Sequence, residues 1–357
     1  MSPFTKRFRR PALVLALPLL LTACGGSTTL KVETRTAPTP ISVSPIAAAP
    51  TVATTTSLTP QASTTPSSVP TTAPTSVVVA NTPVPAANTP VPATGSIEFK
   101  PATLVQGGTT VVYLNESASS ATLRFQDKQY PMLHDGKRFW AMVGVNAFTP
   151  AGVMAASITY TPSGRQDSVT VAASITVQKR DFPVEDIELD DDTAALLDPS
   201  IVNAEVAQRA AIYSGFTAQR LWSGPFLVPG QGTITSIYGE GRSYNGGPVT
   251  DFHKGTDFSG NTGDPVSAAA AGRVAFAGPL KVRGNSVIID HGAGVFTAYH
   301  HLSAIEVKEG QIVKAGDKIG QLGSTGLVTG PHLHWEVIVR GVEVDGRLWL
   351  QGLEIGP

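Results

Sequence analysis

Three short segments between residues 250 and 340 decide how this chain folds and what chemistry it can do: His253-Lys254-Gly255-Thr256-Asp257, Tyr299-His300-His301-Leu302 and Gly330-Pro331-His332-Leu333-His334-Trp335-Glu336. Six of the seven histidines lie in this stretch. Imidazole nitrogens and a carboxylate oxygen are ligands of tetrahedral zinc, and three suffice when water takes the fourth position. The stretch therefore predicts a metal site. Its candidate ligands are His253, Asp257, His291, His300, His301, His332 and His334.

The surrounding segment favours an all-β domain over residues 223–357. It is rich in glycine and carries short Val/Ile runs at residues 272–276, 286–289, 295–299 and 334–339. On a strand, residues i and i+2 project to the same face, so His332 and His334 point the same way. In a helix they would diverge by about 200°. This spacing alone does not choose three ligands from the candidates.

The ordered motifs from about Ser236 to about Asp345 resemble the lysostaphin-type (LytM-like) zinc metallopeptidase family of peptidoglycan hydrolases. The resemblance is carried by the following elements: His253-Lys-Gly-Thr-Asp-Phe258, Gly263-Asp-Pro-Val-Ser-Ala268, Val287-Ile-Ile-Asp-His291, Thr297-Ala-Tyr-His-His-Leu302, Ile319-Gly-Gln-Leu-Gly-Ser-Thr-Gly326 and Thr329-Gly-Pro-His-Leu-His-Trp-Glu336. It implies one Zn²⁺ per chain. The implied metal ligands are His253, Asp257 and His334, and the implied catalytic histidines are His301 and His332.

The resemblance also implies residues that contact substrate: Arg242, Asn245 and Tyr299. A Glu-Gly pair separates Gly239 from Arg242, and Asn245 precedes a glycine, so Asn245 also fits a turn. His300 has no implied function, and alternation along a strand predicts that it points away from His301. We expect His291, beside Gly292, to be structural.

The implied reaction is metal-assisted hydrolysis of amide bonds in the peptide cross-links of peptidoglycan. The chain has no His-Glu-x-x-His helix motif that would supply a glutamate base. His301 and His332 are then the candidates for proton transfer and oxyanion stabilisation, in either assignment. Two alternatives remain open. One is a catalytically weak or inactive protein that binds the wall and activates a peptidoglycan amidase; the other is a peptidase that cuts a secreted protein.

The amino terminus predicts export and a lipid anchor. Residues 1–23 hold four basic side chains, no acidic one and a short apolar run, as in a secretory signal peptide. Leu21-Thr22-Ala23-Cys24 resembles the lipobox of bacterial lipoproteins, which implies cleavage before Cys24 and its acylation. An incidental cysteine after an ordinary signal is the alternative. Cys24 is the only cysteine, so an internal disulfide or thiolate metal site is excluded. We predict a location in the cell envelope, on the extracytoplasmic face of a membrane.

Residues 24–95 are predicted to be a disordered tether. From residue 36 onward they carry no charge, are rich in Pro, Thr and Ala, and twice repeat Ala-Asn-Thr-Pro-Val-Pro-Ala, at 80–86 and 87–93. Such a stretch reaches about 50 Å as a coil and at most about 200 Å when extended.

Without residues 1–23 the chain has 22 basic and 27 acidic groups, a net charge of −5, which argues against nucleic-acid binding.

Two further regions precede the histidine-rich domain. Residues 96–180 alternate apolar and polar residues in short runs between turns, which predicts an antiparallel sandwich, immunoglobulin-like in outline. Residues 181–222 form a connector with an acidic cluster, which we expect to be a solvated face, and a helical pattern at 205–212. Asp192 is a candidate cap for a helix starting at Thr193. The sequence does not indicate an oligomeric state.

Overall fold

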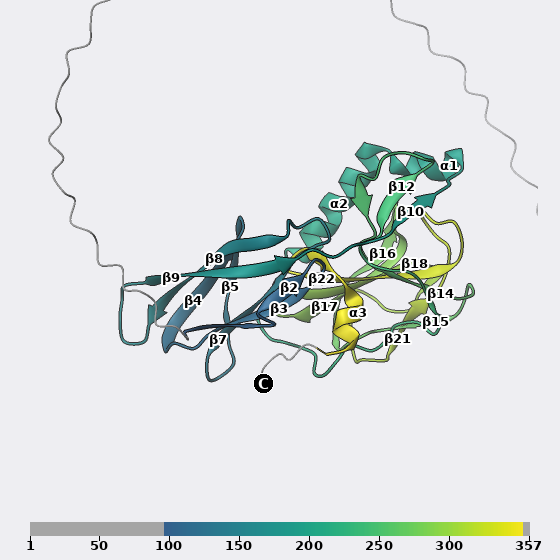
Figure 1. The fold of residues 1–357 in the computed structure, drawn as a ribbon. Helices are drawn as coiled ribbons and strands as arrows, with labels where there is room; N and C mark the ends of the chain where they lie inside the picture. Colours follow the sequence, from purple (N-terminus) through teal and green to yellow (C-terminus); the bar gives the residue numbers. More distant parts are fainter. Residues whose placement is uncertain (1–95, 353–357) are drawn as a thin grey trace, which may run out of the picture. The chain divides into compact units, whose positions relative to one another are not determined.

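A computed structural model describes residues 96–352, which all belong to one compact unit of the chain, Val84–Pro357. The predictions about the signal peptide, Cys24 and the tether lie outside the described residues. The described part is mostly β, as predicted (Figure 1). None of its helices combines the length and apolar character needed to cross a membrane.

Two sheets face each other over residues 97–178. One has the order β1-β3-β7-β6: Ile97–Lys100, Thr109–Leu114, Phe139–Gly144 and Leu133–His134. The other has the order β2-β9-β8-β4-β5: Thr103–Val105, Val169–Gln178, Gly152–Pro162, Ala118–Phe125 and Lys128–Pro131. Apolar side chains from both sheets share one buried core. The predicted sandwich is therefore present, while its likeness to an immunoglobulin domain stays a prediction.

Strands β3 and β7 are buried on both faces. Val112 and its neighbours on one face belong to the sandwich core. On the other face, Val111 and Met142 pack into a second core together with Val337, which belongs to the histidine-rich domain. The sandwich thus backs the sheet that carries the predicted ligands.

The connector contains one strand and two α-helices. Strand β10 (Val184–Ile187) pairs in parallel with β12 (Gly241–Tyr244), which also pairs with β13 (Asp251–Phe252). Helix α1 (Asp191–Ala194) is capped by Asp190, so the prediction that Asp192 caps it was wrong by two residues. A short 3₁₀ turn, Ala195–Leu197, follows. Helix α2 (Pro199–Tyr213) confirms the predicted helix. It begins where the Asp198 carboxylate accepts from the Ser200 amide and Pro199 fixes the first turn.

The central element of residues 223–352 is an antiparallel sheet of eight strands. Its order is β11-β14-β22-β18-β17-β16-β20, with β23 also pairing β22: Ile234–Ser236, Thr256–Ser259, His332–Val339, Val295–Leu302, Gly284–Gly292, Gly272–Leu280, Ile312–Val313 and Val342–Val344. A smaller sheet holds β15, β21 and β19: Pro265–Ser267, Lys318–Gln321 and Ala304–Ile305. Helix α3 is Gly346–Leu350.

The register of this sheet assembles the site. Asp257 on β14 lies directly opposite His334 on β22, and His334 also lies opposite His300 on β18. Side chains at 332, 334 and 336 share one face of β22, because they are two residues apart. Further along that face, Phe296 and Ile338 pack against Tyr213 of α2. The ligand-bearing face is thus covered at one end by the connector helix.

Candidate metal centre

Three ligand atoms from two adjacent strands and the preceding turn converge on one point. His253 Nε2 lies 2.9 Å from His334 Nδ1 and 3.1 Å from Asp257 Oδ1, and the last two atoms are 2.7 Å apart. Zinc bonds of about 2.0–2.1 Å in a tetrahedron place ligand atoms about 3.3 Å apart, so a small outward movement of each side chain accommodates the ion. These residues are a candidate site for one divalent metal ion. Two imidazoles and one carboxylate are a donor set that suits zinc.

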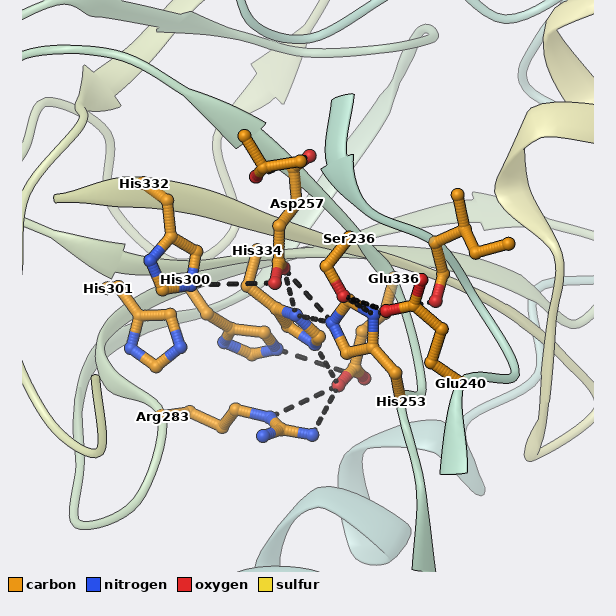
Figure 2. Close-up of polar contacts among 12 residues, drawn as sticks. Ser236, Glu240, His253, Asp257, Arg283, His300, His301, His332, His334 and Glu336 are labelled. Carbon is orange, nitrogen blue, oxygen red and sulfur yellow. Dashed lines mark hydrogen bonds and ion pairs between the residues drawn. The ribbon is translucent and has the colours of Figure 1, made fainter. Parts of the chain in front are cut away.

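The outer nitrogen of each imidazole ligand is held by the protein (Figure 2). Nδ1 of His253 lies 2.9 Å from the carbonyl oxygen of Ile237, to which it donates. Nε2 of His334 lies 3.0 Å from Oε1 of Glu336, which accepts. Each contact fixes the proton on the outer nitrogen and leaves the inner nitrogen as the ligand.

Burial and charge set the protonation of the ligands. Burial lowers the pKa of His253 to about 4, which outweighs the opposing effect of Asp257. Burial alone would raise the pKa of Asp257, but His253 and His334 more than offset this and hold it well below its usual range. The neutral imidazole and the carboxylate are the forms that bind metal.

Two more imidazoles flank the three ligands. The rings of His301 and His332 are 4.9 Å apart, and the ring of His301 is 5.9 Å from that of His334. His301 Nδ1 donates to the Thr325 carbonyl at 2.7 Å, and His332 Nδ1 donates to the Gly330 carbonyl at 2.9 Å. Nε2 of His332 lies 3.8 Å from Asp257 Oδ2. Burial is the main cause that holds the pKa of His301 well below its usual range, so this imidazole is neutral at pH 7.

The prediction that His300 points away from His301 was wrong. His301 has a φ of +62°, a left-handed conformation that interrupts the alternation of the strand. Both rings therefore lie near His334, with centroid distances of 5.6 Å for His300 and 5.9 Å for His301. Ser286 Oγ lies 2.8 Å from His300 Nδ1, while His300 Nε2 lies 3.8 Å from Glu336 Oε2.

A cleft of about 470 Å³ opens over the metal ligands and His332. Arg242 contributes to its lining, and its Nη2 donates to Ser236 Oγ at 3.0 Å and lies 3.9 Å from Asp257 Oδ2. The connector forms another part of the wall through residues 185–189. Here Glu185 pairs with Arg242 and Asp186 accepts from Ser243 Oγ at 2.7 Å. Part of the acidic cluster is thus engaged with β12. The cluster is otherwise solvated, as expected, since Asp186, Glu188, Asp190, Asp191 and Asp192 are exposed.

Two of the predicted substrate residues lie away from this cleft. Asn245 is absent from the residues that line it; its φ is +50°, and its side chain bonds the backbone of Leu189 at 2.7 and 3.3 Å. The turn alternative therefore describes its position. Tyr299 is fully buried, and its hydroxyl accepts from the Ala269 amide at 2.7 Å. The prediction that Tyr299 binds substrate is contradicted, because the side chain faces the core behind the site.

His291 occupies the structural position that we expected. It is fully buried, with Nδ1 2.8 Å from the Ala271 carbonyl and Nε2 2.7 Å from Thr297 Oγ1. Both nitrogens are used by neutral partners, so His291 is not a metal ligand in this arrangement.

Sequence analysis missed the group behind His334. Glu336 is fully buried and also accepts from Arg283 Nη2 at 2.8 Å and from Arg209 Nη1 at 3.0 Å. Burial alone would raise the pKa of Glu336, but Arg209 and Arg283 hold it well below its usual range. The spacing of His334 and Glu336 along one strand was the available signal for the carboxylate. No local signal pointed to the arginines.

Three converging candidate ligands flanked by two further imidazoles in a β-sheet cleft are the arrangement expected of a metal-dependent hydrolase domain. Residues 251–346 match the family described as Peptidase family M23, and this part of the chain is an M23 domain. The predicted family resemblance is therefore confirmed.

Two named proteins are similar to part of this chain. Peptidoglycan DD-endopeptidase ShyA of Vibrio cholerae serotype O1 is 50% identical over 93 residues, which are 26% of this chain and 22% of that protein. ShyB of the same organism, also named a peptidoglycan DD-endopeptidase, is 46% identical over 115 residues, 31% of this chain and 26% of that protein. The chain thus spans about a quarter of the length of these relatives.

One solved structure is similar over more of the chain. It is the crystal structure of a peptidase M23 protein from Pseudomonas aeruginosa, 27% identical, with a TM-score of 0.50. The similarity covers 69% of this chain and 94% of that one, so it extends beyond residues 251–346.

Proposed function

We propose that this protein is a zinc-dependent endopeptidase that hydrolyses amide bonds in the peptide cross-links of peptidoglycan. The observation that carries the proposal is the convergence of His253 Nε2, Asp257 Oδ1 and His334 Nδ1 on one point inside an open cleft. The names of ShyA and ShyB as peptidoglycan DD-endopeptidases support the substrate class.

His253, Asp257 and His334 hold the metal in this proposal. Zinc, when bound there, supplies a Lewis acid that polarises the scissile carbonyl and lowers the pKa of a water molecule. His301 is the proton acceptor, since its Nδ1 donates to Thr325 and its Nε2 carries a free lone pair. His332 supplies the second imidazole, which in its protonated form donates from Nε2 to the oxyanion or to the leaving nitrogen. Arg242, which lines the cleft, binds substrate.

In this proposal, the rest of the chain holds the domain at the cell wall. We infer that residues 1–23 are removed, that Cys24 carries the lipid, and that residues 24–95 form the tether. Residues 96–180 form the supporting sandwich, 181–222 the connector and 223–357 the peptidase domain. The sandwich supports the ligand-bearing sheet through the core that it shares with Val337.

Digestion of purified peptidoglycan by the mature chain tests the proposal, with the released peptides identified by mass spectrometry. We expect new amine and carboxyl ends within the cross-links, and none after chelation or in His334→Ala. His134→Ala, which alters an exposed histidine of the sandwich, is the matched control and should digest normally. Zinc-loaded protein that leaves peptidoglycan intact would contradict the proposal and favour the wall-binding activator.

A further inference from the structure

The buried face of helix α2 is polar. Its three buried residues are Glu205, Arg209 and Tyr213, spaced four apart and therefore on one side of the helix. Glutamate and arginine are almost never fully buried unless they are paired, because removing their charge from water is costly. The partners of this face therefore show what the helix does.

The middle residue reaches the carboxylate that holds a metal ligand. Arg209 Nη1 donates to Glu336 Oε2 at 3.0 Å. The other oxygen, Oε1, faces His334 Nε2 at 3.0 Å and accepts from Arg283 Nε and Nη2 at 3.1 and 2.8 Å. Within the described residues, the Arg209 bond is the shortest contact to Oε2, which also lies 3.8 Å from His300 Nε2. Arg209 therefore fixes the rotation of the carboxylate and, with it, the direction in which Oε1 meets His334.

A second contact leads from the same helix face to the same carboxylate. Oε2 of Glu205 accepts from the Val282 amide at 2.5 Å and from the Arg283 amide at 3.4 Å. This contact anchors the turn between β16 and β17 from which Arg283 reaches Glu336 (Figure 2). At the far end, Tyr213 packs against Phe296 and Ile338 of the same sheet face. All three buried residues of α2 thus contact either the sheet face that carries His334 or the turn from which Arg283 reaches Glu336.

We propose that Arg209 is a positioning residue of the metal centre: through Glu336 it orients His334 so that Nδ1 meets the metal. The inference rests on the proposed function and extends it, since α2 lies outside residues 251–346. The site then consists of the M23 domain together with the connector helix. A connector that served only as a linker between domains would not need an arginine bonded to a carboxylate behind a metal ligand.

Zinc affinity of the mature chain, measured by competition with a chromophoric chelator, tests this inference without relying on turnover. Groups that orient metal ligands typically contribute about 10- to 100-fold to affinity. We expect Arg209→Met to weaken zinc binding by about 10-fold and to change the visible spectrum of the Co²⁺-substituted protein, because the geometry at His334 changes. Folded Arg209→Met protein with wild-type affinity and spectrum would overturn the inference.

Arg180→Met is the matched control. Arg180 Nη1 bonds Asp345 Oδ2 at 2.7 Å, and the Asp345 side chain is 1% exposed, so this change also removes an arginine from a buried carboxylate. Asp345 does not contact a metal ligand, and we expect unchanged zinc affinity. An equal loss of affinity in both variants would show a general effect of destabilisation and would also overturn the inference.

A more conservative change covers the case in which Arg209→Met does not fold. Arg209→Lys keeps the charge but replaces the planar guanidinium by a single flexible ammonium group. We expect zinc binding weaker by about 3-fold, and wild-type affinity in this variant would count against the inference. Wild-type protein that binds no zinc at all would instead refute the proposed function, so the two failures can be told apart.

Discussion

Strand β18 carries a buried polar network on each of its two faces, and only one of them is a metal site. On one face, His291 Nε2 lies 2.7 Å from Thr297 Oγ1, which lies 2.9 Å from the Tyr299 hydroxyl. This series of contacts ends on backbone groups and includes no carboxylate. On the other face, His300 and His301 lie beside His334, whose Nδ1 meets the Asp257 carboxylate. The second network opens into the cleft.

Burial does not distinguish the two networks. His291 and His253 are both buried, and burial lowers the pKa of each to about 4. The difference lies in where the nitrogen atoms point. Both nitrogens of His291 end on neutral protein groups, whereas His253 directs Nε2 to a point shared with another imidazole and a carboxylate. The convergence of metal-ligand atoms on one point, rather than a perturbed pKa, therefore distinguishes the candidate metal site.

The largest expected effect comes from removing a converging nitrogen. His334→Ala should reduce bound zinc from about one per chain to near zero and turnover to the level of chelated enzyme, since only two ligands remain. Elemental analysis of the purified protein measures this. Comparison with His291→Gln, which should retain its zinc, sharpens the contrast between the two networks. Loss of zinc from His291→Gln would contradict the distinction between the two networks.

His301→Ala should separate catalysis from metal binding. The side chain lies beside the ligands without being one of the three, so zinc should stay at about one per chain. Removal of a positioned acid or base typically lowers kcat by about 10²- to 10⁴-fold. Steady-state kinetics on a purified cross-linked peptide, together with zinc content, tests this. Unchanged kcat would exclude His301 from proton transfer.

The dependence of the free energy of unfolding on pH should reveal the buried network around His291. With a folded pKa of about 4 against an ordinary value of 6.5, His291 resists protonation that the unfolded chain accepts. Its contribution to the free energy of unfolding is therefore full above pH 6.5 and declines by about 3 kcal/mol as the pH falls to 4. In metal-free protein, His291→Gln should lose stability less steeply than wild type over this range, as measured by urea unfolding. Identical slopes would contradict the assigned environment.

The smallest effect is expected from Tyr299→Phe. The change leaves the buried Ala269 amide without its acceptor and should cost about 1–3 kcal/mol of stability. KM and kcat should remain within about 2-fold of wild type, because the hydroxyl lies on the face of β18 away from the cleft. A clear rise in KM with unchanged stability would restore the prediction that Tyr299 binds substrate.

The sequence by itself predicted the β-rich class and, through the resemblance to a known family, the three candidate ligand side chains. The alternation of residues along a strand predicted that His332 and His334 project together, and the motif order pointed to His253 and Asp257. These inferences needed only residue types, spacings of two to four positions and the order of the motifs, which a sequence shows directly.

Tertiary structure alone decided which groups surround those ligands. The pairing of β14 with β22 brings Asp257 to His334 across 77 positions, and Arg209 reaches Glu336 across 127. The left-handed backbone of His301 and the inward face of Tyr299 likewise follow from strand irregularity and packing. Contacts between distant segments depend on the register of the whole sheet and on the docking of α2, neither of which leaves a local pattern in the sequence.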